Sequence, residues 1–181
     1  VFPSRPLLPA RNTMQYATLP STHIEVSTIA MGCGALSGDS TWGPQDEKDS
    51  IDAIGAALDA GINFFDTAEM YGGGLSEQML GRGLADKRHS AVIASKFNLE
   101  NSTADDLVST CERSLKYLAT DYIDLYQIHW PSRTVPRDET WAAMKKLRDQ
   151  GKIRHLAVSN FGIGDLDELL PIGRPVTNQL P

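Results

Sequence analysis

The 181-residue sequence has two cysteines, no run of eighteen apolar residues, and fewer basic than acidic side chains. The cysteines, Cys33 and Cys111, are too few for a disulfide scaffold and lie in apolar patterns, so we expect both to be buried and inert in a reducing compartment. The missing apolar run excludes a membrane-spanning helix. With 17 basic and 23 acidic residues, the net charge of −6 argues against nucleic-acid binding. The 41% hydrophobic content predicts a packed core.

The amino end of the sequence has no clear folded pattern. Residues 1–24 contain two arginines and no acidic residue, and residues 1–13 contain three prolines. We interpret residues 1–14 as a leader, disordered or upstream of a true start at Met14, and residues 15–181 as the folded domain. This predicts a cytoplasmic protein; if residues 1–13 end a transit peptide, a plastid or another organelle is expected instead. The last residues lie in an apolar stretch, which we interpret as a cut.

Between the ends, short apolar runs alternate with amphipathic segments. A hairpin is predicted at residues 16–27 around Pro20. Core strands are predicted at residues 28–32, 62–66, 91–95, 121–128, 154–158 and 175–179. Helices are predicted at residues 46–60, 76–85, 103–118, 138–151 and 165–170, from their apolar spacing and from capping residues such as Thr103 and Asp138.

This alternation predicts parallel strands joined by helical crossovers. The two candidate architectures are an open doubly wound sheet and a (β/α)8 TIM barrel. The first lacks its expected G-x-G-x-x-G between strand and helix. A complete barrel takes about 250 residues. We therefore expect an incomplete (β/α)8 barrel, with an N-terminal hairpin, five βα units and the start of strand six.

Polar residues stand at or just after the ends of the predicted strands, where such barrels place their active sites. Each alone has an ordinary explanation, as a cap, a rim contact or a hydrogen-bonded core residue. Together, on consecutive strands, they favour one shared site. The candidates in chain order are Asp66, Tyr71, Lys96, His129, Ser159, Asn160 and Gln179.

The chemistry of this group suits proton transfer to a carbonyl. A free phenol, with a pKa of about 10, is a poor acid near neutrality, and a neighbouring cation makes it a better one. Lys96 would supply the cation, held charged by Asp66. Neutral His129 would orient a substrate oxygen, and Tyr71 would protonate a carbonyl that accepts a hydride. A single nearby histidine gives no sign of a metal site, and no nucleophile with a general base is recognisable.

Several motifs then occur in a fixed order. They are Gly-Ile-Asn-Phe-Phe-Asp-Thr-Ala-Glu-Met-Tyr-Gly at 61–72, Ser-Glu-x-x-Leu-Gly at 76–81, Ala-Ser-Lys-Phe at 94–97, Asp-Tyr-Ile-Asp-Leu-Tyr-Gln-Ile-His-Trp-Pro at 121–131, Gly-Lys-Ile-Arg-x-Leu-Ala-Val-Ser-Asn-Phe at 151–161 and Asn-Gln at 178–179. With them the sequence resembles the aldo-keto reductase family over residues 16–181. The residues around Met70 and Trp130 are similar to those of the family branch that contains bacterial-type and plant reductases and the potassium-channel β subunits.

The resemblance implies a barrel whose hairpin closes the bottom, and NADPH-dependent reduction of an aldehyde or ketone to an alcohol. The implied catalytic residues are Asp66, Tyr71, Lys96 and His129. The implied cofactor contacts are Gly34, Leu36, Asp66, Ser159, Asn160 and Gln179. Candidate substrate-pocket residues are Trp42, Met70 and Trp130, for which rim packing is an equal alternative. We interpret the glycines at 72–74 as a flexible link.

The family's last two strands have no counterpart in the sequence. In the family they carry the aromatic that stacks on nicotinamide and the basic loop that grips the 2′-phosphate. We therefore expect this chain alone to be a poor reductase that self-associates through open barrel edges or depends on a second chain. A regulatory cofactor-binding protein like the channel β subunits, and an inactive fragment, are the alternative functions.

Overall fold

The computed structural model describes residues 14–98 and 103–181, so the leader expected at 1–14 lies outside the described residues except for Met14. The strands are β1 (Tyr16–Thr18), β2 (Glu25–Ser27), β3 (Met31–Gly32), β4 (Phe64–Asp66), β5 (Val92–Phe97), β6 (Ile123–Ile128), β7 (Ile153–Ser159) and β8 (Asn178–Gln179). The helices are α1 (Glu47–Asp59), α2 (Leu75–Leu84), α3 (Ala104–Tyr117), α4 (Arg137–Asp149) and α5 (Ile163–Leu169). Short 3-10 turns are η1 (Gly34–Ser37), η2 (Tyr71–Gly74) and η3 (Ala85–Ser90).

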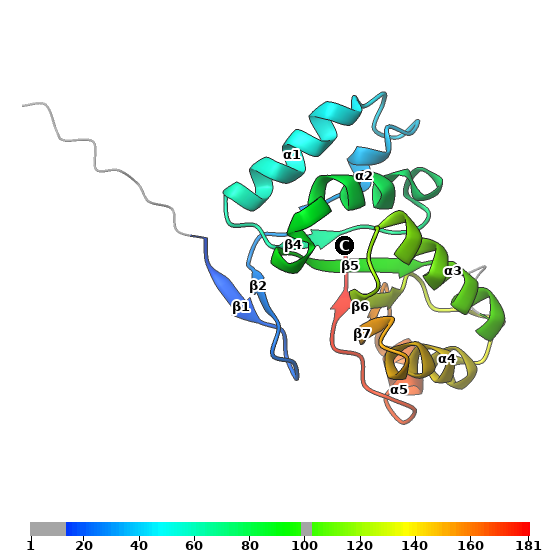
Figure 1. Ribbon diagram of the computed structural model, residues 1–181. Coiled ribbons are helices and arrows are strands. Elements are labelled where there is room, and N and C mark those ends of the chain that lie inside the picture. Colours follow the sequence, from blue (N-terminus) through cyan, green and yellow to red (C-terminus); the bar gives the residue numbers. More distant parts are fainter. Residues whose placement is uncertain (1–13, 99–102) are drawn as a thin grey trace, which may run out of the picture.

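Strands β3 to β8 form one six-stranded parallel sheet in chain order, and a helix crosses over between each pair of neighbours. The helices lie along one side of this sheet, while β1 and β2 form a separate hairpin at the amino ends of its strands (Figure 1). This confirms the predicted hairpin, five βα units and start of a sixth strand. Within the described residues, no helix is both long and apolar enough to cross a membrane.

A single side-chain contact shows that the sheet is curled as in a barrel. Gln179 on β8 donates from Nε2 to Oδ2 of Asp66 on β4, at 3.2 Å. Four strand spacings separate these strands, and in a flat sheet four spacings of about 4.8 Å would hold them about 19 Å apart. Two side chains of this length cannot bridge that gap. The curl therefore confirms part of a (β/α)8 barrel and excludes the open doubly wound sheet.

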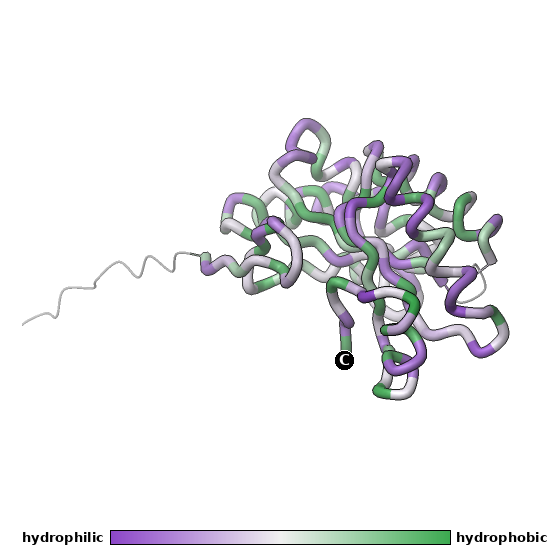
Figure 2. Tube along the Cα trace, turned by 90° about the horizontal axis from the view of Figure 1, so that it is seen from below, coloured by the Kyte–Doolittle hydropathy of each residue, from purple (hydrophilic) through white to green (hydrophobic). Residues whose placement is uncertain are grey.

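The two faces of the curled sheet have different surroundings. Side chains of alternating strand residues that point outward, such as Phe65, Ile93 and Phe97, join the main core beneath the helices. The inner face carries a smaller apolar cluster of Ala94, Leu125 and Ala157. Hydrophobic and hydrophilic stretches alternate along the helices (Figure 2), as expected for helices that cover a sheet on one side only.

The hairpin packs against the amino ends of the strands. Tyr16 donates from its hydroxyl to the Gly61 carbonyl at 2.8 Å, and the backbone N–H of Ser27 donates to Asn63 Oδ1 at 2.7 Å. Leu19 packs on the inner-face cluster. The hairpin therefore closes the end of the half-barrel opposite to the carboxyl ends of the strands, as the family resemblance implies.

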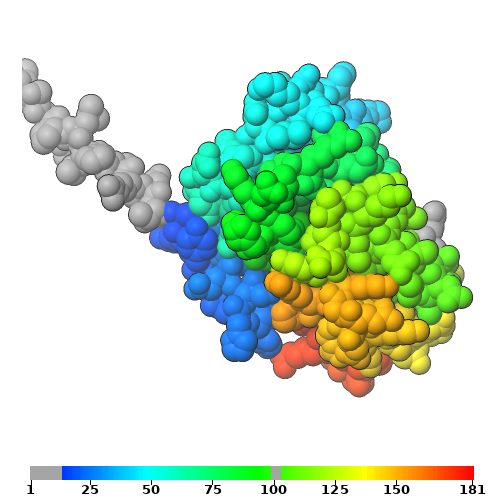
Figure 3. Space-filling model, viewed as in Figure 1, coloured from blue at the N-terminus to red at the C-terminus, as the bar shows by residue number. Residues whose placement is uncertain are grey.

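Successive units pack against one another in order. In Figure 3 the surface colours follow the chain from α1 through α2 and α3 to the segments beyond residue 150. Contacts between neighbouring helices, α1 with α2 and onward to α5, support this arrangement. Each helix therefore buries one side on the sheet and its flanks on the helices before and after it.

Two predicted helix starts were wrong. We expected Asp138 to cap the fourth helix, but α4 begins earlier, after Pro136, and Asp138 lies in its first turn. The fixed φ of proline places Pro136 just before the first turn, where a missing N–H costs nothing. Helix α5 begins two residues before the predicted Asp165, because the Asp165 carboxylate accepts the backbone N–H of Gly162 at 3.1 Å.

Both cysteines behave as predicted from their apolar surroundings. Cys33 and Cys111 are fully buried in the main core and are free thiols. Burial raises the pKa of each thiol to about 12. Neither therefore forms the thiolate that redox or nucleophilic chemistry requires.

Candidate active site

Lys96 is the centre of the predicted catalytic group. It lies near the carboxyl end of β5 on the inner face, two residues after Ala94, and is only 1% exposed. Its Nζ donates to Asp66 Oδ1 at 2.8 Å and Oδ2 at 2.9 Å, to the Thr67 carbonyl at 3.0 Å and to Tyr71 Oη at 3.3 Å. The structure therefore brings three of the four predicted residues into direct contact around one ammonium group.

Tyr71 is held at the rim by the turn η2, which follows β4 after a short loop. Its backbone N–H donates to the Ala68 carbonyl at 3.1 Å. Its hydroxyl oxygen accepts a hydrogen bond from Lys96, and no acceptor for the hydroxyl hydrogen is found among the described residues. The phenol therefore keeps a hydrogen that it can donate to a substrate oxygen.

His129 lies beside this group, after the end of β6. Its ring centroid is 6.0 Å from that of Tyr71, in an edge-to-face arrangement, and only 5% of the residue is exposed. Burial, and then the charge of Lys96, lower the pKa of His129 from 6.5 to about 4. Its Nδ1 is buried and has no hydrogen-bond partner in the described part of the chain. The imidazole is therefore neutral at physiological pH.

The predicted amide and hydroxyl contacts form one hydrogen-bond network that reaches the predicted catalytic group. Asn160 donates from Nδ2 to the His129 carbonyl at 2.9 Å and to Ser159 Oγ at 3.0 Å. Ser159 Oγ donates to the Gln179 carbonyl at 3.1 Å. The Gln179 side chain then reaches Asp66. Residues from the ends of four strands are thereby held in one arrangement.

Sequence reasoning did not place Gln127 in this site. It lies on β6 two residues before His129, and its Nε2 donates to Gln179 Oε1 at 3.1 Å. It also lines an inner-face cavity of about 240 Å³ together with Asp66 and Gln179. Side chains two residues apart on a strand share a face, so the position of His129 could have identified Gln127.

The remaining predicted residues divide into two groups. Trp42, Met70 and Trp130 are exposed large side chains, and the Trp130 ring stacks on His129 with centroids 3.7 Å apart. A Cβ atom at Gly34 would lie 3.6 Å from Trp42 Nε1 and 3.8 Å from the Tyr71 ring, which places these residues side by side. By contrast, the Leu36 side chain is buried in the main core.

A second polar layer lies behind Lys96. Ser95, the preceding residue on β5, points outward and donates from Oγ to Glu77 Oε1 at 2.6 Å. Glu77 on α2 is fully buried, and burial raises its pKa to about 7.

In the described part of the chain, no group of three or more His, Cys, Asp or Glu side chains is arranged to hold a metal ion.

Comparison with known proteins identifies the family. Residues 28–181 match the Aldo/keto reductase family, and the chain belongs to it. It is 43% identical over 178 residues to the aldo-keto reductase YhdN of Bacillus subtilis, covering 93% of this chain and 54% of that protein. It is 39% identical over 163 residues to the methylglyoxal reductase YeaE of Escherichia coli, covering 86% of this chain and 55% of YeaE. The chain thus spans about half the length of these relatives.

Solved structures agree with this assignment. The thermostable aldo-keto reductase Tm1743, in complex with the inhibitor epalrestat, superposes with a TM-score of 0.86 at 35% identity, over 92% of this chain and 62% of that one. An aldo-keto reductase from Klebsiella pneumoniae in complex with NADPH superposes with a TM-score of 0.76 at 32% identity, over 82% of this chain and 51% of the other. The half-barrel is therefore the fold of a reductase family member.

Proposed function

We propose that the protein carrying this chain reduces aldehydes or ketones to alcohols, with NADPH as hydride donor and Tyr71 as proton donor. The observation that carries the proposal is the hydrogen bond from Lys96 to Tyr71 Oη within a buried ion pair. It leaves the phenol hydrogen free and stabilises the negative oxygen that remains after proton transfer. The names of the similar proteins, which include an NADPH-bound aldo-keto reductase and a methylglyoxal reductase, support this class of reaction.

His129 would hold the substrate oxygen next to the phenol. A buried nitrogen without a partner is less costly as a lone pair than as an N–H, so the unpartnered Nδ1 favours the neutral tautomer with its hydrogen on Nε2. That hydrogen can be donated to a carbonyl oxygen. Because the imidazole is neutral, it orients the oxygen and does not compete with Tyr71 as the acid.

The chemistry of the strand-end residues fits the carboxamide of a nicotinamide. Ser159, Asn160 and Gln179 offer hydroxyl and amide groups, which match a carboxamide in donors and acceptors. Bound NADPH supplies a hydride to the carbonyl carbon. The residues of this chain would fix the ring orientation, exclude water with Trp42 and Trp130, and deliver the proton.

The experiment is aldehyde-dependent oxidation of NADPH by the full-length protein and by Tyr71→Phe. We expect the variant to lose about 10²- to 10⁴-fold in turnover and to keep its NADPH affinity, measured by fluorescence. Tyr122→Phe is the matched control, because Tyr122 lies between Arg88 and Arg154, outside this site. Unchanged turnover in Tyr71→Phe would remove Tyr71 from its role, and NADPH binding without any carbonyl-dependent oxidation would contradict the enzymatic function.

A further inference from the structure

A basic cavity lies between α4, the start of β7 and the segment at residues 172–176. Its volume is about 220 Å³, smaller than the roughly 300–1,000 Å³ of pockets for drug-sized ligands. No acidic residue lines it, although the chain as a whole carries a net charge of −6. The lining residues with N–H donors on their side chains are Trp141, Lys145, Arg148, Arg154, His155 and Arg174. We call this cavity the basic pocket.

Two cations of the basic pocket have no counter-ion among the residues that the structure describes. Arg154 pairs with Asp124 at 2.9 Å, and Arg148 pairs with the adjacent Asp149 at 2.9 Å. Lys145 and Arg174 have no ion-pair partner in the part of the chain that the structure describes. The pocket therefore keeps an excess of positive charge that a bound anion would neutralise.

An indole also lines the basic pocket. Trp141 lines the basic pocket, is only 3% exposed, and carries one side-chain N–H donor, at Nε1. Gly173 packs directly against it, since a Cβ there would lie 1.9 Å from Nε1. An indole N–H is a donor from which an anion in the pocket can accept a hydrogen bond.

The charges of Arg154 and Arg148 also act on the imidazole of His155. Burial lowers its pKa, Asp124 opposes this effect, and Arg154 and Arg148 lower the pKa further. His155 is thus a neutral hydrogen-bonding group at the wall of the pocket and adds no third unpaired charge at neutral pH.

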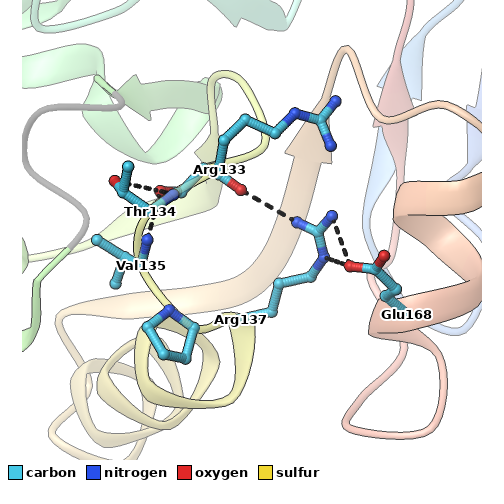
Figure 4. Close-up of a pocket in the computed structure, with 7 residues that line it drawn as sticks. Arg133, Thr134, Val135, Arg137 and Glu168 are labelled. Carbon is cyan, nitrogen blue, oxygen red and sulfur yellow. Dashed lines mark hydrogen bonds and ion pairs between the residues drawn. The ribbon is translucent and has the colours of Figure 1, made fainter.

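A second arginine-lined cavity differs from the basic pocket because carboxylates already pair with its cations. This cavity, of about 360 Å³, contains Arg133 and Arg137 and also Glu168 (Figure 4). Arg137 pairs with both Glu168 and Asp165 at 2.8 Å, and Arg133 pairs with Asp165 at 2.8 Å. Its cations pair with carboxylates of α5. In the basic pocket, no carboxylate among the described lining residues pairs with Lys145 or Arg174.

We propose that the basic pocket is a binding site for a phosphate group, either free phosphate or the phosphate of a small metabolite. Guanidinium and ammonium groups together with neutral N–H donors are the usual partners of such an oxyanion. The site is separate from the proposed catalytic group: His155 precedes Ser159 by four residues along β7, or about 13 Å at about 3.3 Å per residue. It therefore goes beyond the proposed reductase function and stands without it.

The first test is a titration of the ¹⁵N-labelled full-length protein with inorganic phosphate, followed on the tryptophan indole N–H signals. We expect the Trp141 signal to move downfield in a saturable way while the signals of Trp42 and Trp130 stay in place. Trp141→Phe assigns the signal. A Trp141 signal that does not move, or that moves equally with sodium chloride of the same ionic strength, would overturn the proposal.

The second test compares neighbouring lysines of α4. Lys145→Met should weaken phosphate binding about tenfold or more, the size expected for one charge-assisted hydrogen bond. Lys146→Met removes the same charge from an exposed position outside the pocket and should leave the affinity unchanged. Equal losses in both variants would show a general charge effect and contradict a built site. Circular dichroism and thermal unfolding identify any variant that fails to fold, and Arg174→Gln, on a loop, then serves in place of Lys145→Met.

Acetate and glycerol phosphate at matched ionic strength distinguish the ligand chemistry. A tighter response to glycerol phosphate than to free phosphate would identify a phosphorylated metabolite as the ligand, and the reverse order would identify phosphate itself. A response to acetate as strong as that to phosphate would overturn the phosphate assignment.

Discussion

Lys96 and Asp66 form a buried ion pair that joins two neighbouring strands, with Nζ 2.8 Å and 2.9 Å from the two carboxylate oxygens. The Lys96 side chain is 2% exposed and that of Asp66 18%. Taking an ammonium group out of water is costly unless its hydrogens are all used. Here they are used by Asp66, the Thr67 carbonyl and Tyr71. The ion pair therefore serves the stability of the rim as well as the proposed chemistry.

We predict that Asp66→Asn lowers the free energy of unfolding by about 3 kcal/mol, because it leaves the Lys96 ammonium buried without its carboxylate. Lys96→Met in the same background should recover part of this loss, since it removes the unpaired charge. Urea unfolding of the wild type, both single variants and the double variant measures the coupling. Strictly additive losses would show that the two side chains are not coupled.

The lowered pKa of His129 predicts a pH-dependent stability. The unfolded chain takes up a proton at this residue below pH 6.5, but the folded protein does so only below about pH 4. Between these values the unfolded state binds more protons, so folding stability falls as the pH falls. In His129→Asn this contribution is absent. The wild type should therefore lose about 2 kcal/mol more than the variant between about pH 7 and about pH 4.5.

Urea unfolding at both pH values tests this prediction. His23→Asn is the matched control, because His23 is exposed on the hairpin and its loss should leave the pH profile of the wild type unchanged. A His129→Asn profile parallel to that of the wild type would mean that the imidazole is not held neutral by its surroundings.

The sequence predicted the order of elements and the meeting of Asp66, Tyr71 and Lys96, because parallel strands bring their carboxyl ends to one edge. It did not predict the residues at which α4 and α5 begin. The start of α4 depended on the backbone of Pro136 and the start of α5 on the Asp165 carboxylate, both local choices with several acceptable outcomes. The strand alternation before His129 points to the position of Gln127, but not to its partner Gln179, which lies 52 residues further along the chain. Such a partner follows from the curl of the sheet and not from a local pattern.

The glycines after Tyr71 also differ from the expected flexible link. Gly73 and Gly74 have φ values of +62° and +96°, and a Cβ at Gly74 would lie 2.4 Å from the Tyr117 ring, whereas one at Gly73 would meet nothing within 4 Å. We predict that Gly73→Ala costs about 1–2 kcal/mol for the left-handed backbone alone. Gly74→Ala should cost about 1–3 kcal/mol more because the methyl group overlaps the ring. Thermal and urea unfolding measure both, and equal losses would show that Tyr117 moves aside without cost.

Glu77 predicts a pH dependence of the opposite sign to that of His129. Its folded-state pKa is raised from 4.5 to about 7, mainly by burial, and its Oε2 has no partner among the described residues. Between these values the folded state holds a proton that the unfolded chain has lost, so stability falls as the pH rises. The full effect, reached above about pH 7, is about 3 kcal/mol at about 1.4 kcal/mol per pKa unit.

Glu77→Gln separates this titration from the hydrogen bond to Ser95. The glutamine amide oxygen can still accept from Ser95 Oγ, as Glu77 Oε1 does at 2.6 Å, but it carries no ionisable group. We therefore expect the variant to match the wild type near about pH 5 and to be about 3 kcal/mol more stable near about pH 8. Glu139→Gln, at an exposed position in the first turn of α4, should show no such gain. If Glu77→Gln is less stable than the wild type at both pH values, the carboxylate is ionised and paired in the folded protein, and Ser95 and Lys96 are then positioned by a charge rather than by a neutral acid.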